Sequence, residues 1–333
     1  MGGTALLAKA GIESHRLTMD EFNRVKSEVH AILDDLGIRW LDVDFIHEKT
    51  DFGDIDIILI DDRPPETLST DNNSPAKVVL DNIDKFGITD ELFINNSPFA
   101  SILYEGKYQV DFITVAADRA KYTQAYLSHN DLGNLLGRTI KRFNMTHAMD
   151  GLFYDHYINN RTQRHRFLLS TDPHEILRIL NLDVEKFKAG FDTYQEMFDY
   201  VQGSKYFNPE LFKFENLNNR NRVRDKKRKV YNDFLNYIDF SKTNNLEYDP
   251  KVDYPWLNES IAEFDIEYER RKAIREAVPG GYVMKRTGLK GKDLGILIDM
   301  IKVTYDNDLI GITEEQLNHY IDVCYAAYKS GQR

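Results

Sequence analysis

The segment from Asp51 to Ile60, DFGDIDIILI, constrains the fold of this chain more than any other. Its run of β-branched residues predicts a strand, in which successive side chains alternate between the two faces of a sheet. Asp54 and Asp56 then lie on one face while Ile55 and Ile57 point into a core. Two adjacent carboxylates repel each other and lose hydration, so a strand with no use for them is expected to avoid the pair. A hard divalent cation supplies such a use, because Mg²⁺ accepts carboxylate oxygens and keeps positions open for substrate phosphates.

A second strand carries a third carboxylate. YQVDFITV, from Tyr108 to Val115, places Asp111 on one face and Val110 and Phe112 on the other. If the two strands are neighbours, three carboxylates meet on one surface of the sheet, which is enough to hold two metal ions. Paired acids at a strand edge indicate metal-assisted phosphoryl or nucleotidyl transfer. The alternative for an isolated D-x-D is a solvated strand end.

GDIDIIL followed by VDFITV resembles the catalytic core of the polymerase-β-like nucleotidyltransferase superfamily, which includes family X DNA polymerases and CCA-adding enzymes. The resemblance implies that Asp54 and Asp56 bind two Mg²⁺ ions, with Mn²⁺ as an alternative metal. It implies that Asp111 binds the ion that activates the attacking hydroxyl. SHNDLGNLLGRTIKRF is similar to a stretch of family X polymerases that approaches the incoming nucleotide, which implies nucleotide contacts at Asn134 and Arg138.

Glycines and a lysine complete the expected nucleotide site. The superfamily has a Gly-Ser or Gly-Gly pair shortly before the two acids, and DVDFIHEKTDF contains none. MGGTALLAKAGI resembles the GGTAL segment of abortive-infection-type nucleotidyltransferases, where glycine amides and a helix start bind phosphate. Disorder near a terminus is the alternative for this segment. The residues expected to contact the nucleotide here are Gly2, Gly3, Thr4, Lys49 and Gly53.

A dense basic cluster lies between Arg220 and Lys229, in a chain whose formal net charge is −11. Such a cluster can neutralise several phosphates of a polynucleotide backbone, although a solvated helix face is the alternative. The turn TGLKGKDLG is similar to a segment in the helical region of CCA-adding enzymes. The residues expected to contact nucleic acid are Arg220, Arg222, Arg224, Lys226, Lys227, Arg228, Lys229, Lys290 and Lys292.

The composition of the chain limits the classes of protein to which it can belong. No apolar run approaches the roughly 18 residues that a membrane span needs, and the N-terminus lacks the pattern of a secretion signal. The single cysteine, Cys324, excludes an internal disulfide and a cysteine-based zinc cluster, and its spacing from apolar neighbours predicts a packed position in a helix. We therefore expect a cytoplasmic protein without a membrane partner. The oligomeric state stays open.

The pattern along the chain predicts an α+β fold. Residues 1–150 are expected to form the catalytic domain, a small mixed or antiparallel sheet flanked by helices. MDEFNRVKSEVHAILDDL predicts an amphipathic helix, and Phe99–Tyr104 with Tyr108–Val115 predict a hairpin. The apolar face of that helix is expected to consist of Phe22, Val25, Val29 and Ile32.

Strand signals fade from about Asp155, so residues 151–333 are expected to form a mostly helical domain that binds the acceptor. The expected helices include HEILRIL, YQEMFDYV with Thr193 as its cap, and SIAEFDIEYERRKAIREAV. Ser241 to Asn258 is expected to connect two of them.

Together these features predict an enzyme that moves a nucleoside monophosphate from an NTP, such as ATP, to a hydroxyl and releases pyrophosphate. We favour the 3′ end of a polynucleotide as acceptor, tRNA-like RNA before DNA. Two other functions stay open. One is a transferase that modifies a protein, a small molecule or one particular tRNA. The other is an inactive nucleic-acid-binding protein, as the missing Gly-Ser pair would allow.

Overall fold

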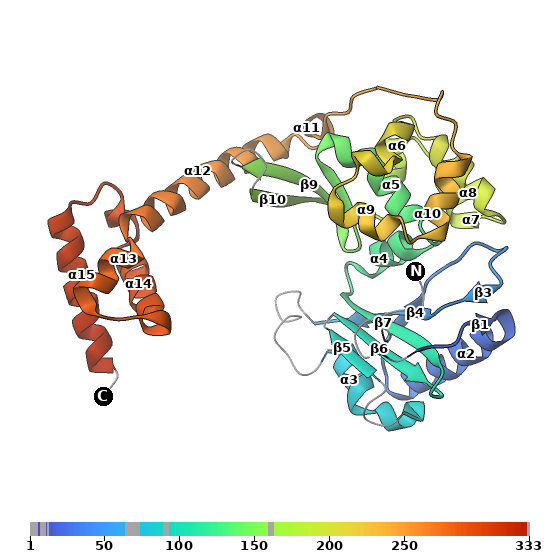
Figure 1. The fold of residues 1–333 in the computed structure, drawn as a ribbon, viewed down its shortest axis with the longest axis horizontal. Coiled ribbons are helices and arrows are strands. Elements are labelled where there is room, and N and C mark those ends of the chain that lie inside the picture. The colour runs from blue at the N-terminus through green and yellow to red at the C-terminus, as the bar shows by residue number, and fades with distance from the viewer. Residues whose placement is uncertain are drawn as a thin grey trace. The chain divides into compact units, whose positions relative to one another are not determined.

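The computed structural model describes residues 6, 11, 13–63, 74–88, 93–96, 98–158 and 163–331. The chain divides into two compact units, Met1–Pro250 and Lys251–Arg333, each of which is described by itself. The first unit contains a mixed sheet with helices and the second is helical, which confirms the expected α+β class (Figure 1). Residue 150, where a domain boundary was expected, lies inside the first unit.

A five-stranded sheet in the order β2-β4-β7-β6-β5 forms the centre of the N-terminal region. Strands β4 and β7 run parallel, and the other neighbours run antiparallel. The expected hairpin of β6 and β7 is confirmed, with Glu105 and Gly106 at positive φ in its turn. The strands are β2 (Trp40–Asp42), β4 (Ile55–Asp61), β5 (Phe93–Asn96), β6 (Phe99–Tyr104) and β7 (Tyr108–Ala116).

One face of this sheet packs on two helices. Ile55 and Ile57 of β4 and Phe112 of β7 are buried there against α2 (Met19–Asp35) and α3 (Pro75–Asp81), as alternation along the strands requires. The expected α2 face is confirmed at three positions, while Leu33 takes the buried place expected for Ile32, which is only partly buried. The fully buried residues of α2 are Phe22, Val25, Val29 and Leu33.

The start of α2 is tied to the strand segment before β4. Thr18 and Glu21 form a capping box, in which each side chain accepts a hydrogen bond from the other residue's backbone N–H. The short strand β1 (Leu17–Thr18) pairs antiparallel with β3 (Asp51–Phe52). Because Asp54 follows β3 by only two residues, this pairing places the start of α2 close to the first acid.

The opposite sheet face is covered only along part of its length by the described residues. Ile58 and Ile60 of β4 and Ile113 of β7 form a small apolar cluster there with Ala120 of α4 (Ala120–Leu127). These residues lie towards the carboxyl ends of the two parallel strands. The amino-terminal ends of the same face carry the acidic residues.

The rest of the first unit has its own hydrophobic core, built mainly from helices. The predicted cap of α8 is confirmed, because the Thr193 side chain accepts from the backbone N–H of Glu196. The helices are α5 (Leu132–Ile140), α6 (Glu175–Leu180), α7 (Val184–Ala189), α8 (Tyr194–Gln202), α9 (Asn219–Asp225) and α10 (Lys229–Tyr237). The 3₁₀ turns of the chain are η2 (Ile83–Phe86), η3 (Lys141–Phe143), η4 (Pro209–Phe212), η5 (Phe214–Asn216) and η6 (Asp306–Leu309).

The expectation that strands fade near Asp155 is wrong. Strands β8 (Met145–Ala148), β9 (Gly151–Ile158) and β10 (Gln163–Ser170) form an antiparallel sheet in the order β10-β9-β8. β10 reads QRHRFLLS, with exposed or half-buried residues on both faces, so no apolar alternation announces it. Pairing with β9 across the hairpin, rather than one buried face, holds this strand in place.

The second unit consists of helices around one hydrophobic core. α12 matches the expected helix of residues 260–278 to within one residue at its end but begins earlier, at Trp256, inside the expected connector. Cys324 of α15 is buried, as predicted. No helix within the described ranges is long and apolar enough to cross a membrane. The helices are α11 (Pro250–Asp253) at the unit boundary, α12 (Trp256–Ala277), α13 (Gly280–Thr287), α14 (Gly291–Tyr305) and α15 (Glu314–Gly331).

Candidate metal centre

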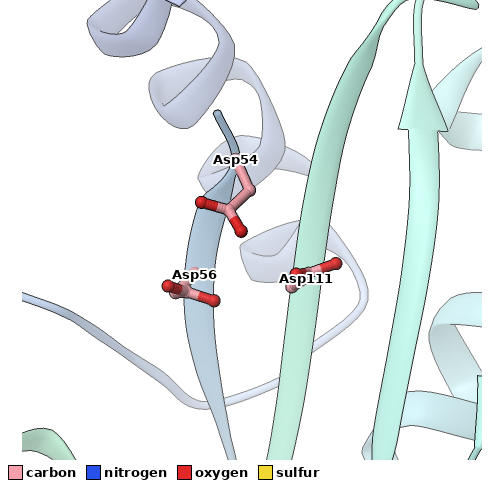
Figure 2. Close-up of side chains that lie close together, drawn as sticks. All are labelled: Asp54, Asp56 and Asp111. Atoms are coloured by element: carbon pink, nitrogen blue, oxygen red, sulfur yellow. The ribbon is translucent and has the colours of Figure 1, made fainter. Parts of the chain in front are cut away.

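Three carboxylates meet on the partly covered face of the large sheet. The parallel register of β4 and β7 places Asp56 directly beside Asp111, and Asp54 lies on the same face just before β4 begins. One carboxylate oxygen from each residue lies within 4.8 Å of the other two. Figure 2 shows Asp56 on one strand, Asp54 where that strand begins, and Asp111 on the neighbouring strand. The structure thus brings together the three acids that the sequence singled out, hereafter the acidic triad.

Burial next to other carboxylates makes ionisation of the triad unfavourable. Burial, followed by the charges of Asp54 and Asp111, raises the pKa of Asp56 well above its usual value. Burial and the charge of Asp54 likewise raise the pKa of Asp111 to about 6. A divalent cation among these oxygens would reverse the balance, because it favours the charged form of each carboxylate.

Two polar side chains hold Asp111. The Gln109 amide nitrogen donates to both carboxylate oxygens at 2.9 Å, and Ser101 also forms a side-chain hydrogen bond to Asp111. Sequence reasoning missed both residues. Gln109 could have been found, because it lies two residues before Asp111 and therefore shares its face. Ser101 could not, because only the antiparallel register of β6 and β7 places it opposite Asp111.

The N-terminal segment reaches this site at Leu6. Gly2, Gly3 and Thr4, which the sequence indicates as a phosphate-binding turn, lie outside the described residues. Leu6 is buried, and its backbone N–H donates to the Gln109 side-chain oxygen at 3.4 Å. The same Gln109 amide group holds Asp111. Leu6, two residues after Thr4, therefore lies close to the triad.

Lys49 is the cation that lies in the field of the triad. Burial lowers its pKa, while the charges of Asp54 and Asp56 act in the opposite direction. Its ammonium group lies 4.6 Å from the centre of the Phe52 ring, which is buried in the sheet core. Gly53, between Phe52 and Asp54, is itself buried. Lys49 is thus placed to meet an anion that approaches the two acids of β4.

Asn134 and Arg138, the other expected nucleotide contacts, are held by residues of the basic cluster. Arg138 Nη2 lies 2.5 Å from Asp225 Oδ2, and Arg224 donates to the Asn134 oxygen at 2.7 Å. Asp225 is fully buried. Among the described residues, Asn134 Nδ2 and Arg138 Nε are buried without a hydrogen-bond partner. Residues expected in two different roles therefore belong to one network between α5 and α9.

The basic cluster divides into internal and outward-facing residues. Arg224 contacts Asp225, and Arg228 pairs with Asp131 of the α5 cap, so these two arginines brace the helical core. The outward group lies on α9, on the turn that follows it and at the start of α10, and Lys229 in it pairs with Asp233 of its own helix. The outward residues are Arg220, Arg222, Lys226, Lys227 and Lys229.

Lys290 and Lys292 lie exposed at the start of α14, where Gly288 and Gly291 both adopt positive φ. This turn has the glycine-containing form that the sequence predicts, and it belongs to the second unit.

Comparison with protein-family models produced no match, and comparison with curated proteins produced none either. The arguments for function therefore rest on the residues and their geometry. In chemical terms, the acidic triad could hold a metal ion.

Proposed function

We propose that the chain is a metal-dependent nucleotidyltransferase, which moves a nucleoside monophosphate from an NTP to a hydroxyl group and releases pyrophosphate. The acidic triad carries this proposal, because its oxygens converge within 4.8 Å on two paired strands. Oxygen ligands of this kind suit Mg²⁺, or Mn²⁺ in its place. When bound, such an ion would supply a Lewis acid that offsets charge on the phosphate oxygens and favours ionisation of the attacking hydroxyl.

In the proposed reaction, the Asp111 carboxylate accepts the proton of the acceptor hydroxyl. The hydroxyl oxygen then forms a bond to the α-phosphorus of the NTP, and the bond from that phosphorus to the bridging oxygen breaks. The electron pair leaves with pyrophosphate. Gln109 keeps the Asp111 carboxylate oriented during this step through its two hydrogen bonds.

The remaining nucleotide contacts are proposed from position. Lys49 would meet a phosphate, because it lies in the field of Asp54 and Asp56. The segment Gly2–Thr4 would add backbone amides, since Leu6 after it lies against Gln109. Asn134 and Arg138 each offer a buried donor for which no partner is found among the described residues.

We propose the 3′ end of RNA as the acceptor, with DNA as the second choice, and the cytoplasm as the setting. The outward residues of the basic cluster other than Lys229 support a polynucleotide, because no carboxylate among the described residues pairs with them and they can neutralise phosphates. Residues 151–333 keep their proposed role as the region that binds the acceptor.

Transfer of label from α-labelled NTPs tests the proposal. Each NTP is incubated with the protein, Mg²⁺ and a mixture of RNA, DNA and protein acceptors, and the labelled product is identified. Asp54→Ala and Asp111→Ala should each abolish transfer while circular dichroism shows an intact fold. Full activity in either variant would overturn the assignment of the triad.

The labelled product also separates the rival functions. Label on a protein, a small molecule or one particular tRNA would identify a modifying transferase. Binding of RNA or DNA without binding of Mg²⁺ and NTP would identify an inactive nucleic-acid-binding protein.

A further inference from the structure

A cationic groove lies in the second unit, between α12 and the end of α14. Its volume is about 430 Å³, and it is lined by four cations and a single carboxylate. Ile274 and Val303 supply its apolar part. The cations are Arg270, Arg271, Arg275 and Lys302, and the carboxylate is Asp306. This excess of positive charge is local, since the chain as a whole carries a net charge of −11.

Two of the four cations are already paired within the protein. Arg270 bonds to Glu267 at 2.6 Å and to Asp306 at 2.9 Å. Arg271 bonds to the other oxygen of Glu267 at 2.5 Å. These contacts hold both guanidinium groups in place at the groove.

The other two cations are not paired. Among the described residues, no carboxylate lies within ion-pair distance of Arg275 or Lys302. Arg275 is exposed on α12, and Lys302 is half-buried on the last turn of α14. The two donors therefore line one groove from two different helices and stay available to an anion.

The apolar part of the groove has a buried and an exposed side. Ile274 is 7% exposed and belongs to the core of the unit, whereas Val303 is 81% exposed. An exposed valine between cations suits a ligand that combines negative charge with apolar surface. A polynucleotide has this combination, because its phosphates are joined by sugars that carry bases with apolar faces, and arginine binds phosphate oxygens in pairs.

We propose that this groove binds the sugar-phosphate backbone of a single-stranded polynucleotide, with Arg275 and Lys302 each contacting a phosphate. The identity of the ligand rests on the proposed function, which requires a polynucleotide acceptor. The groove is separate from Lys290 and Lys292, because twelve helical residues place Lys290 about 18 Å from Lys302 along α14.

The test measures binding of the full chain to a short fluorescent single-stranded RNA, by anisotropy, over a range of salt concentrations. EDTA is present and NTP is omitted, so that transfer plays no part. The double variant Arg275→Gln/Lys302→Gln should bind about tenfold more weakly. The slope of log affinity against log salt should fall by about 1.4, since each lost phosphate contact on a single strand contributes about 0.7.

The matched control is Lys285→Gln/Lys329→Gln, which removes the same charge from exposed positions on α13 and α15 of the same unit. It should leave the slope unchanged. An equal loss in both double variants, or no loss in the first, would overturn the inference. So would displacement of the RNA by poly-glutamate at equal charge concentration, because the groove would then bind acidic chains in general.

The two proposals fail in different ways. If the chain binds RNA through Arg275 and Lys302 but transfers no label, the proposed function is refuted and the proposed RNA-binding groove is supported. If the chain transfers label to RNA and the double variant binds RNA as tightly as the wild type, the proposed function is supported and the proposed RNA-binding groove is refuted.

Discussion

Two sheets of the first unit hold carboxylates in opposite surroundings: Asp155 is fully buried and the acidic triad is half-buried. On β9, the side chain of Asp155 is fully buried, and the chain supplies it with donors. Lys141 Nζ lies 2.6 Å from its Oδ2, and Thr146 donates to the same oxygen at 2.6 Å. Arg166 Nε lies 3.2 Å from Oδ1, and Arg164 lies 3.5 Å from Oδ2.

On the large sheet, the carboxylates of Asp56 and Asp111 lie next to each other and to the carboxylate of Asp54. Burial raises the pKa of Asp155, yet the Lys141 and Thr146 hydrogen bonds and nearby positive charges bring it below the usual value. For Asp56 and Asp111, burial and neighbouring carboxylates act together, so their pKa values are raised. Asp155 is an anion that the fold has neutralised by itself. The triad concentrates carboxylates whose ionised form a bound cation would favour.

The largest expected effect on stability concerns Asp155. Asp155→Asn keeps the shape of the side chain but removes the charge that holds three cations together, so we expect a loss of about 3 kcal/mol. Urea unfolding measures it. In EDTA, Asp111→Asn should show the opposite sign, because it removes repulsion from the triad. Equal losses in both variants would erase the contrast between the sheets.

A divalent ion should stabilise the large sheet. Ligand at one hundred times its dissociation constant adds about 2.7 kcal/mol to the free energy of unfolding. We therefore expect Mg²⁺ or Mn²⁺ to raise the melting temperature of the wild type at neutral pH. Asp54→Asn/Asp111→Asn is the control, in which the shift should disappear. A shift of the same size in that variant would place the ion elsewhere.

The pH dependence of the metal-free protein follows from the raised pKa of Asp111. The unfolded carboxyl ionises near pH 4, whereas the folded one ionises near pH 6, so the folded state binds more protons between these values. The free energy of unfolding should therefore fall as pH rises from about 4 to about 6, by roughly 2 kcal/mol from this group. Urea unfolding in EDTA gives the free energy of unfolding of the wild type and of Asp111→Asn at each pH. The difference between the two values cancels the contributions of other acids. A difference that grows in favour of the wild type would contradict it.

Gln109 should give the smallest effect. Gln109→Ala removes both amide hydrogen bonds to Asp111, each of which favours the ionised carboxylate. Since one such bond contributes about 1 kcal/mol, we expect transfer to fall about fivefold to tenfold at slightly acidic pH. The acid limb of the pH–rate profile should move to higher pH, and the loss of transfer activity should become smaller as the pH rises. A uniform loss across pH would instead indicate a structural role.

Much of the local structure could be predicted because it depends on neighbours in sequence. The faces of β4 and β7 follow from alternation, and the cap at Thr193 follows from a side chain that reaches the next turn of backbone. The hairpin of β6 and β7 needs only a short turn. The β9–β10 hairpin escaped prediction, because β10 has no buried residues and is held by pairing with β9.

The acids that form the candidate site could be predicted from the sequence, but the residues that surround them could not. Asp54, Asp56 and Asp111 were identifiable from two strand motifs. The role of Arg224 as a partner of Asn134, ninety residues away, could not be predicted. The sequence of a basic run does not indicate whether its side chains face solvent or a buried acid.

The sequence by itself determined which side chains share a face, because strand geometry sets that alternation within a few residues. Only the tertiary structure decided that β4 lies parallel to β7, with Asp56 beside Asp111. Only the tertiary structure decided which carboxylates the cations pair with, because the energy of an ion pair depends on the distance between its charges and on their burial. Neither follows from spacing along the chain. Tertiary contacts set the three acids beside one another and gave three cations to Asp155.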